Sequence, residues 1–324
     1  FRHMLLDPRD EPLLLAIFNI SVTVIPAAAA LLLLPPSNWL GLAYLVTMYV
    51  LWGARFLLAF HYSAHRRLFC EDYSLLNYWN EWVLAPMFGI PCGVYTTHHC
   101  AMHHTEDNSE WDLSSTEPYQ RDNFLHFLAY WLRHALCSLV ELPLYCIRRQ
   151  RWDLLGKLVL GGVLWITVVT AMYGVAPVQT KWILIIPYLV TSFLLMFGNW
   201  SQHIFVDPTK PDSDYTLTYN CVAHADNQQT FNDGYHSIHH LNSRTHWSEM
   251  PQKFLDTIDK HGAENALVFR GIGFFEIGAA CLTGNLGWLA DHVVSCTSTP
   301  KERDELIFLM KQRLRPVKRN SKML

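Results

Sequence analysis

Charged residues are scarce in this sequence. Asp, Glu, Lys and Arg make up 16% of its 324 residues, against about 25% in typical soluble domains. Hydrophobic residues make up 51%, which excludes a disordered chain, and the formal net charge is only −3. So weak a charge argues against a nucleic-acid partner, because phosphates attract strongly basic proteins. The composition lies between those of a soluble enzyme and a bundle of membrane helices, and it predicts a protein with both parts.

Two common metal-binding motifs are also missing. None of the eight cysteines forms a Cys-x-x-Cys pair, so the sequence predicts reduced thiols and no disulfide framework. No Glu-x-x-His occurs in the chain, which excludes the soluble four-helix design that binds two irons through carboxylates. Because the sequence starts with Phe and not with Met, we expect further residues before it.

Long uncharged segments predict four membrane-spanning helices. Residues 12–54, 158–180 and 182–206 contain no Asp, Glu, Lys or Arg, and one span needs about 20 apolar residues. The turn signal Pro35-Pro36-Ser37-Asn38 divides the first segment, and Lys181 separates the other two. The predicted spans, arranged as two hairpins, are 13–34, 39–60, 158–178 and 182–202. Residues 124–147 mix apolar, aromatic and basic side chains, which predicts an amphipathic helix at the membrane interface.

The positions of Lys and Arg predict the orientation in the membrane. The two hairpin turns contain only Lys181, whereas basic residues are frequent between the hairpins and at the end of the chain. Because basic residues prefer the cytosolic side, we expect both termini and the segments 61–154 and 204–300 to face the cytosol. The sequence thus predicts a single-domain, all-α integral membrane protein with a cytosolic helical cap and a basic tail, 301–324. Lys322, third from the end, favours the endoplasmic reticulum membrane.

Histidine is abundant, and its spacing is informative. The chain contains 17 His, and nine of them fall into groups with spacings of three or four residues. On a helix these spacings put side chains on one face, so each group can direct its imidazoles at one point. In the predicted topology all of these groups lie on the cytosolic side, close to the membrane. The groups are His61 and His65; His99, His103 and His104; Asn199 and His203; and His236, His239 and His240.

These histidines predict a metal centre. Nine imidazoles are too many for one tetrahedral zinc ion, but they suit two metal ions with four or five ligands each. Imidazole binds iron, zinc and copper, so the ligand type leaves the metal open. His261 and six other histidines have no partner at helical spacing, so we expect His261→Ala to be nearly neutral. Candidates for carboxylates and amides that orient the ligands are Asp72, Glu106, Asp107, Asn232 and Asp233.

The histidine groups resemble those of the membrane fatty acid desaturase superfamily. The matching segments are HYSAH at 61–65, HCAMHH at 99–104 and HSIHH at 236–240, and NWSQH at 199–203 is similar to an element of acyl-CoA desaturases. The resemblance implies a non-haem di-iron centre in which Asn199 binds one iron through water. The iron ligands that it implies are His61, His65, His99, His103, His104, His203, His236, His239 and His240.

The resemblance also implies a reaction. A desaturase removes two hydrogens from a lipid acyl chain and forms a double bond, using two Fe²⁺ ions, O₂ as co-substrate and electrons from an external donor such as cytochrome b5 or a ferredoxin. No catalytic residue is expected beyond the metal centre, because no side chain is a strong enough oxidant to break an unactivated C–H bond.

Other functions stay open at this point. The same histidine groups occur in hydroxylases, so a fatty acyl or sphingolipid hydroxylase with the same di-iron site is the nearest alternative. A membrane zinc hydrolase is more distant, because nine histidines exceed what one zinc with an activated water requires. A channel is disfavoured, because the predicted spans are almost free of the ionisable residues that channels place in the membrane. The acyl carrier, the chain length, the bond position and the oligomeric state are not predicted.

Overall fold

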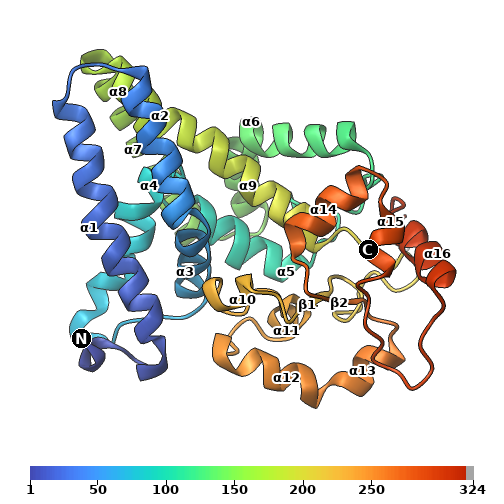
Figure 1. The fold of residues 1–324 in the computed structure, drawn as a ribbon. Coiled ribbons are helices and arrows are strands. Elements are labelled where there is room, and N and C mark those ends of the chain that lie inside the picture. The colour runs from blue at the N-terminus through green and yellow to red at the C-terminus, as the bar shows by residue number, and fades with distance from the viewer. Residues whose placement is uncertain (319–324) are drawn as a thin grey trace. The chain divides into compact units, whose positions relative to one another are not determined.

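A computed structural model describes residues 1–318, and this part of the chain is mostly helical (Figure 1). Arg319 and Lys322 of the predicted basic tail lie outside the described residues. Four helical stretches are long and apolar enough to cross a membrane, and each overlaps one predicted span. The predicted helical membrane fold with four spans is therefore confirmed. The observed stretches are Pro8–Leu33, Asn38–His65, Trp152–Val175 and Pro177–Gln202.

The chain divides into two compact units, which we describe separately. The first contains Phe1–Ala101 and Ala135–Leu194, and the second contains Met102–His134 and the residues from Leu195 onward. Three helices begin in one unit and end in the other. They are η6 (Thr96–His103), α6 (Phe124–Arg148) and α9 (Ile186–Gln202). The helix predicted over residues 124–147 is α6.

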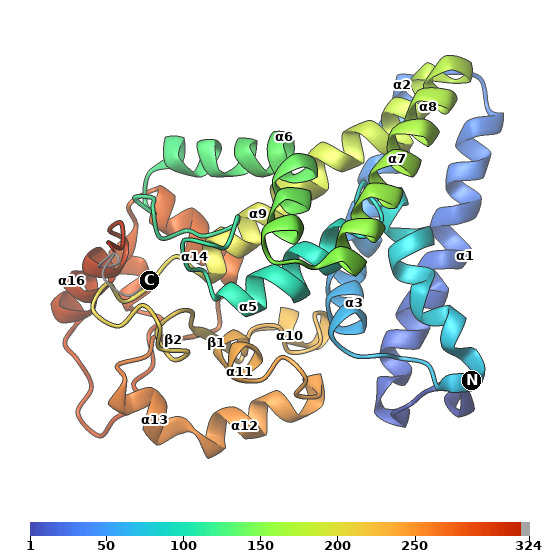
Figure 2. The ribbon, with the colours of Figure 1, turned by 180° about the vertical axis from the view of Figure 1, so that it is seen from behind.

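The first unit contains two helical hairpins that meet at their turns. Ser37 follows the Pro-Pro turn, and its hydroxyl accepts a hydrogen bond from the Leu40 backbone N–H at 3.4 Å, which caps the first turn of α2. The Asn38 side-chain oxygen accepts hydrogen bonds from Lys181 Nζ at 2.6 Å and from Trp182 Nε1 at 3.0 Å. These contacts join the beginning of α2 to the second hairpin. Figures 1 and 2 accordingly show α2, α7 and α8 side by side.

The remaining bounds in this unit show that its long helices continue through short 3₁₀ or π-helical turns. The elements are η1 (Arg2–Met4), η2 (Pro8–Asp10), α1 (Glu11–Leu33), α2 (Asn38–Met48), η3 (Tyr49–Gly53), α3 (Ala54–His65), η4 (Glu71–Tyr78), η5 (Asn80–Leu84), α4 (Ala85–Met87), α7 (Trp152–Val175), α8 (Pro177–Thr180) and η7 (Lys181–Ile185). One consequence matters for function: because α3 ends only at His65, both histidines of the first group lie on a helix.

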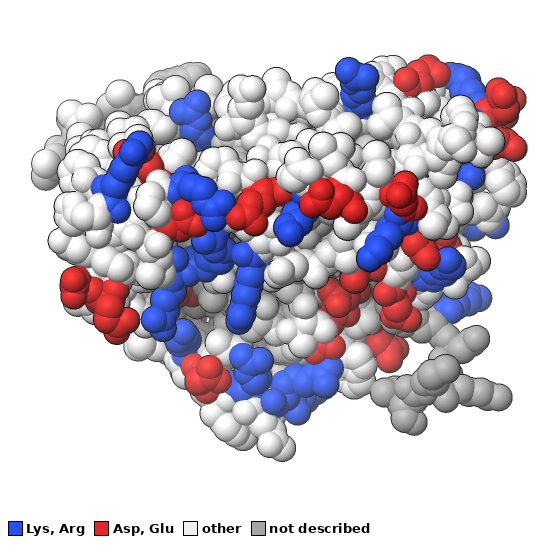
Figure 3. Space-filling view, turned by 90° about the horizontal axis from the view of Figure 1, so that it is seen from below, with Lys and Arg blue, Asp and Glu red and all other residues white. Residues whose placement is uncertain are grey.

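The outer surface of the hairpins is apolar. Phe18 and Val22 of α1 and Val163 and Ile166 of α7 are large side chains that are at least half exposed. Exposed apolar surface of this extent is typical of helices that contact lipid. The view from below in Figure 3 differs, because positive and negative side chains are interspersed there.

The second unit consists of short helices around a two-stranded sheet. The strands β1 (Asn220–Val222) and β2 (Val268–Arg270) are parallel, with Asn220 opposite Val268. The other elements are α5 (His104–Glu106), α10 (Asp226–Gln229), α11 (His236–Leu241), η8 (Trp247–Glu249), α12 (Met250–Asp256), α13 (Ile258–Ala263), α14 (Phe274–Leu282), α15 (Leu286–Ala290) and α16 (Arg303–Arg313). The strands place Asn220 next to α11, which carries the third histidine group.

A fully buried arginine connects distant parts of the second unit. The Arg121 guanidinium donates hydrogen bonds to the backbone carbonyls of Ile204 at 2.8 Å, Arg313 at 2.7 Å and Arg315 at 2.6 Å. Burial lowers the pKa of Arg121 to about 10, so the group stays charged at neutral pH. The five-donor guanidinium suits this role, because it can satisfy several carbonyls from a single position.

Candidate metal centre

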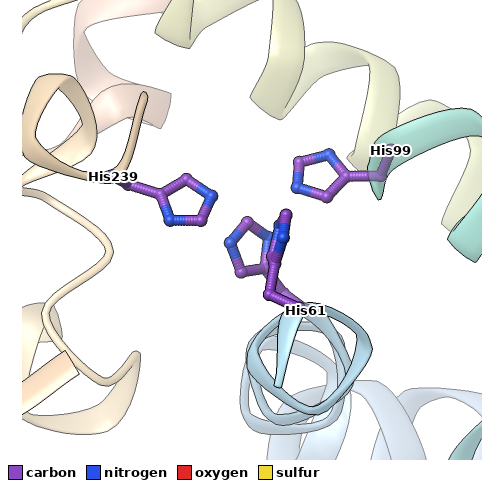
Figure 4. Close-up of side chains that lie close together, drawn as sticks. His61, His99 and His239 are labelled. Carbon is purple, nitrogen blue, oxygen red and sulfur yellow. The ribbon is translucent and has the colours of Figure 1, made fainter. Parts of the chain in front are cut away.

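Three predicted ligands come together in the first unit. His61 and His65 lie one helical turn apart on α3, and His99 lies on η6. One ring nitrogen of each lies within 4.8 Å of one nitrogen of each other. Figure 4 shows the rings of His61 and His99, with their centroids 4.5 Å apart. Ring nitrogens this close and facing a common point are arranged as metal ligands are.

An aromatic side chain supports this first group. The Tyr95 hydroxyl lies 3.1 Å from Nδ1 of His61, and the Tyr95 ring stacks on His99 with centroids 5.2 Å apart. Tyr95 therefore restrains both imidazoles. Cys100 Sγ lies 3.9 Å from Nε2 of His65. Burial raises the pKa of the Cys100 thiol to about 12, so the group is neutral at physiological pH.

A second group lies entirely within the second unit. His103 of η6, His203 and His240 of α11 again have ring nitrogens within 4.8 Å of one another. The ring of His236 lies beside them, 4.9 Å from His240 between centroids. His103, His203 and His236 are almost completely buried. Burial of these rings limits the access of solvent to the point that they surround.

His203 has the protonation state that a metal ligand needs. Its Nδ1 lies 3.1 Å from the Leu217 carbonyl oxygen, which can only accept, so Nδ1 carries the hydrogen. Its Nε2 is buried and has no hydrogen-bond partner among residues 1–318. Burial lowers the pKa of His203 to about 3, so the imidazole is neutral at physiological pH. A buried lone pair on a neutral ring fits a metal ion and is costly without one.

A carboxylate orients His103. Asp112 Oδ2 lies 2.6 Å from Nδ1 of His103, and both side chains are buried. Asp112 Oδ1 accepts hydrogen bonds from the backbone N–H and the hydroxyl of Ser114, at 2.8 and 2.7 Å. Such a carboxylate fixes the tautomer of a metal-bound histidine and makes its other nitrogen a better ligand.

Sequence reasoning missed Asp112. The residue lies nine positions after His103 in a loop that contains several other acids, and no helical spacing connects the two. Asp107 and Asn108 adopt left-handed backbone conformations, with φ of 45° and 57°, and they begin the turn that brings Asp112 back to His103. The tolerance of Asp and Asn for this conformation is the only sequence signal of that turn.

Two of the predicted orienting carboxylates do lie beside histidines. Asp107 Oδ1 is 3.6 Å from Nδ1 of His240, and Asp233 Oδ1 is 3.9 Å from Nδ1 of His236. Burial raises the pKa of Asp233 to about 7. Asn232 instead donates a hydrogen bond to the Trp247 carbonyl, which is a structural role.

The remaining two predicted ligands of the second unit contact each other. Nε2 of His104 lies 3.0 Å from Nε2 of His239. Two ring nitrogens at this distance must share a proton or a metal ion, since two bare lone pairs repel each other. With this pair, all six predicted ligands of the second unit lie in one cluster.

Asn199 is held in a defined orientation. Its Nδ2 donates hydrogen bonds to the Tyr130 hydroxyl at 2.7 Å and to the Ser114 carbonyl at 3.1 Å. The Tyr130 hydroxyl in turn donates to the same carbonyl at 3.0 Å. Because both N–H groups of the amide are used, Oδ1 is the atom that remains to accept a hydrogen bond from a water. Ser114 thus supports Asn199 as well as Asp112.

Comparisons with known proteins bear on this arrangement. A family model described as "Fatty acid desaturase" matches residues 37–265, more than half of the chain. The match includes all three histidine groups and the Asn199–His203 pair. No curated protein and no solved structure gives a match.

Proposed function

Because the chain belongs to the fatty acid desaturase family, we propose that it is a membrane-bound desaturase that acts on a lipid acyl chain. The reaction would remove one hydrogen from each of two adjacent methylene groups and leave a double bond. O₂ would take up these two hydrogens, together with two electrons and two protons, and leave as two water molecules. The observation that carries the proposal is the set of two histidine groups, each partly buried, within the matched range.

Each histidine group would hold one iron ion. His61, His65 and His99 would bind the first, and His103, His203, His236 and His240 would bind the second. His104 and His239 would be further ligands, and Asn199 would bind through water. When bound, the irons supply the reduction of O₂ and the oxidation of the C–H bonds.

The protein's own residues would prepare this chemistry. Asp112 and the Leu217 carbonyl fix the tautomers of His103 and His203, so that each presents Nε2. Tyr130 and Ser114 orient Asn199. Neutral imidazoles leave two Fe²⁺ ions with their full positive charge, in contrast to carboxylate ligands. Burial of His61, His103, His203, His236 and His239 limits the access of water, which reduces side reactions.

We further propose that the protein lies in the endoplasmic reticulum membrane with the histidine groups and both termini on the cytosolic side. The distribution of Lys and Arg supports this orientation. The electron donor would then be a cytosol-facing carrier of the cytochrome b5 or ferredoxin type.

Lipid profiling tests the reaction. The chain is expressed in yeast beside His239→Ala and a matched control, His292→Ala, in which the replaced histidine lies in the same unit outside both groups. We expect acyl chains that lose two hydrogens with the wild type and with His292→Ala, but not with His239→Ala. Mass-spectrometric fragmentation then locates the double bond.

Other outcomes would redirect the assignment. Chains that gain one oxygen would identify a hydroxylase with the same ligands. Activity that persists without O₂ would favour a zinc hydrolase. Equal lipid profiles for the wild type and His239→Ala, in cells supplied with a donor, would contradict both iron-dependent reactions.

A further inference from the structure

His261 occupies the centre of a buried hydrogen-bond network in the second unit. The residue lies in α13 and is fully buried. Its Nδ1 lies 2.9 Å from the Thr257 carbonyl oxygen, which can only accept, so Nδ1 carries the hydrogen. Its Nε2 therefore accepts. It lies 3.0 Å from Asn220 Nδ2 and 3.2 Å from the Ser237 hydroxyl.

This network reaches the helix with the third histidine group. α11 has six residues, and the residue before it, Tyr235, provides no side-chain cap. The first N–H groups of a helix have no partner within the helix. The Asn220 side-chain oxygen accepts the N–H of Ser237 at 3.2 Å, so β1 supplies a cap that α11 lacks. Because Asn220 donates to His261 through Nδ2, His261 determines which end of the amide faces α11.

The ring of His261 is itself held firmly. Tyr215 and Phe254 pack against it edge-on, with centroids 4.8 and 5.0 Å away. Burial lowers the pKa of His261, which keeps the imidazole neutral. A charged ring would carry a second N–H that faces the donor Nδ2 of Asn220, so only the neutral ring completes the network.

We propose that His261 is a positioning residue for the metal centre, acting through Asn220 and Ser237 to fix α11 and the directions of its three imidazoles. The inference rests on the proposed metal-binding role of His236, His239 and His240. It replaces the expectation that His261→Ala is nearly neutral. His261 has no histidine partner at helical spacing, and the partners of its Nε2 come from β1 and α11, which are distant in sequence.

Metal binding tests this proposal without the need for turnover. The purified full-length protein is freed of metal and titrated with Co²⁺, whose visible absorption reports the geometry of its ligands. We expect His261→Leu to weaken Co²⁺ binding at one site about tenfold, in line with losses from residues that orient ligands, and to change the absorption band. His261→Gln is expected to restore most of the affinity, because its side-chain oxygen can accept in place of Nε2.

His292→Leu is the matched control. Its Nδ1 also lies 2.9 Å from the carbonyl oxygen four residues earlier, that of Trp288. We expect wild-type Co²⁺ binding from this variant. Asn220→Ala is expected to weaken the same site as His261→Leu does, and the double variant to weaken it no further, because the two residues act as one unit.

Three results would overturn the inference: wild-type affinity in His261→Leu, equal losses in His261→Leu and His261→Gln, or additive losses in the double variant. If His261→Leu does not fold, His261→Gln and Asn220→Ala decide the question. A protein that binds Co²⁺ as expected but forms no double bonds would contradict the proposed function and leave this inference standing. If the wild type forms double bonds but Co²⁺ binding is unchanged in Asn220→Ala and His261→Leu, the proposed function is supported and the role of His261 is contradicted.

Discussion

Asp112 and His103 form a buried pair, with a carboxylate oxygen 2.6 Å from Nδ1 of the imidazole. The Ser114 backbone and hydroxyl hold the same carboxylate from the other side. The pair is thus the best supported contact around any of the proposed ligands, and it gives the first prediction.

Replacing Asp112 with Asn is expected to lower iron affinity and desaturation by about 10-fold to 100-fold, because the charge that stabilises the oriented imidazole is removed. Iron content of the purified protein and product formation in yeast are the measurements. Asp122→Asn is the control, since Asp122 lies in the same polar stretch but is exposed. Full iron content and full activity in Asp112→Asn would exclude an orienting role.

The low pKa of His203 predicts a loss of stability in acid. The ordinary pKa of histidine is about 6.5, so unfolded His203 gains a proton below that pH, while the folded residue stays neutral down to about 3. The contribution to the free energy of unfolding is thus complete above about pH 6.5 and decreases as the pH falls toward 3. The unfolding temperature of the metal-free protein in detergent should fall between pH 7 and pH 5, and less so in His203→Gln. An equal fall in both proteins would refute the assignment.

Tyr130→Phe tests whether the orientation of Asn199 matters for activity. The variant keeps the ring but removes the hydroxyl that accepts from Asn199 Nδ2. A neutral hydrogen bond contributes about 1 kcal/mol, so we expect activity to fall about fivefold while iron content stays near that of the wild type. Tyr119→Phe serves as control, because the Tyr119 ring lies beside Tyr130, with centroids 5.7 Å apart. A larger loss in the control would show that ring packing matters more than Asn199.

His103→Ala is expected to abolish activity while the protein still inserts into the membrane. The ring lies in the second group, and its loss also removes the imidazole nitrogen that lies 2.6 Å from Asp112 Oδ2. Membrane fractionation and lipid profiling of the same cells separate the two effects. Full turnover in this variant would remove His103 from the set of ligands.

Close packing in the first unit predicts a contrast between two neighbouring glycines of α7. A Cβ atom on Gly161 would lie 2.0 Å from the Cys92 carbonyl oxygen, whereas one on Gly162 would meet nothing within 4 Å. Gly161→Ala is expected to destabilise the protein by about 1 to 3 kcal/mol, as overpacking does. Thermal unfolding in detergent should show this loss in Gly161→Ala and not in Gly162→Ala. Equal stability of the two variants would contradict the tight contact at Cys92.

The membrane helices were predictable, because local sequence features alone determine them. Uncharged segments longer than a bilayer requires gave the four spans, and the turn at Pro35 divided the first hairpin correctly. The predicted span ended at residue 60, whereas α3 continues to His65. The apolar segment is shorter than the helix, so hydrophobicity alone did not give the end of the helix. Helical spacing predicted that His61 and His65 lie together, but the group in the second unit joins His103, His203 and His240 from three different segments, which spacing did not predict.

The supporting residues were not predictable in the same way. Asp112, Tyr130 and His261 act on residues that are 9, 69 and 24 positions away, namely His103, Asn199 and Ser237. No periodicity connects such pairs, because loops and tertiary packing bring them together. The sequence ranked Asp72 equally with Asp107 and Asp233, and only the folded structure shows that Asp72 is exposed whereas Asp107 and Asp233 lie beside histidines.

The buried Arg121 has a consequence for the order in which the protein matures. Two of the carbonyls that receive its hydrogen bonds, those of Arg313 and Arg315, lie 192 and 194 residues further along the chain. Until the ribosome has released that stretch, the guanidinium is a charge without its full set of acceptors, and burying it is unfavourable. The segment that also contains Asp112 and Ser114 therefore closes late, after all four membrane helices have been made. Assembly of the histidine groups would accordingly be completed only after translation of the chain.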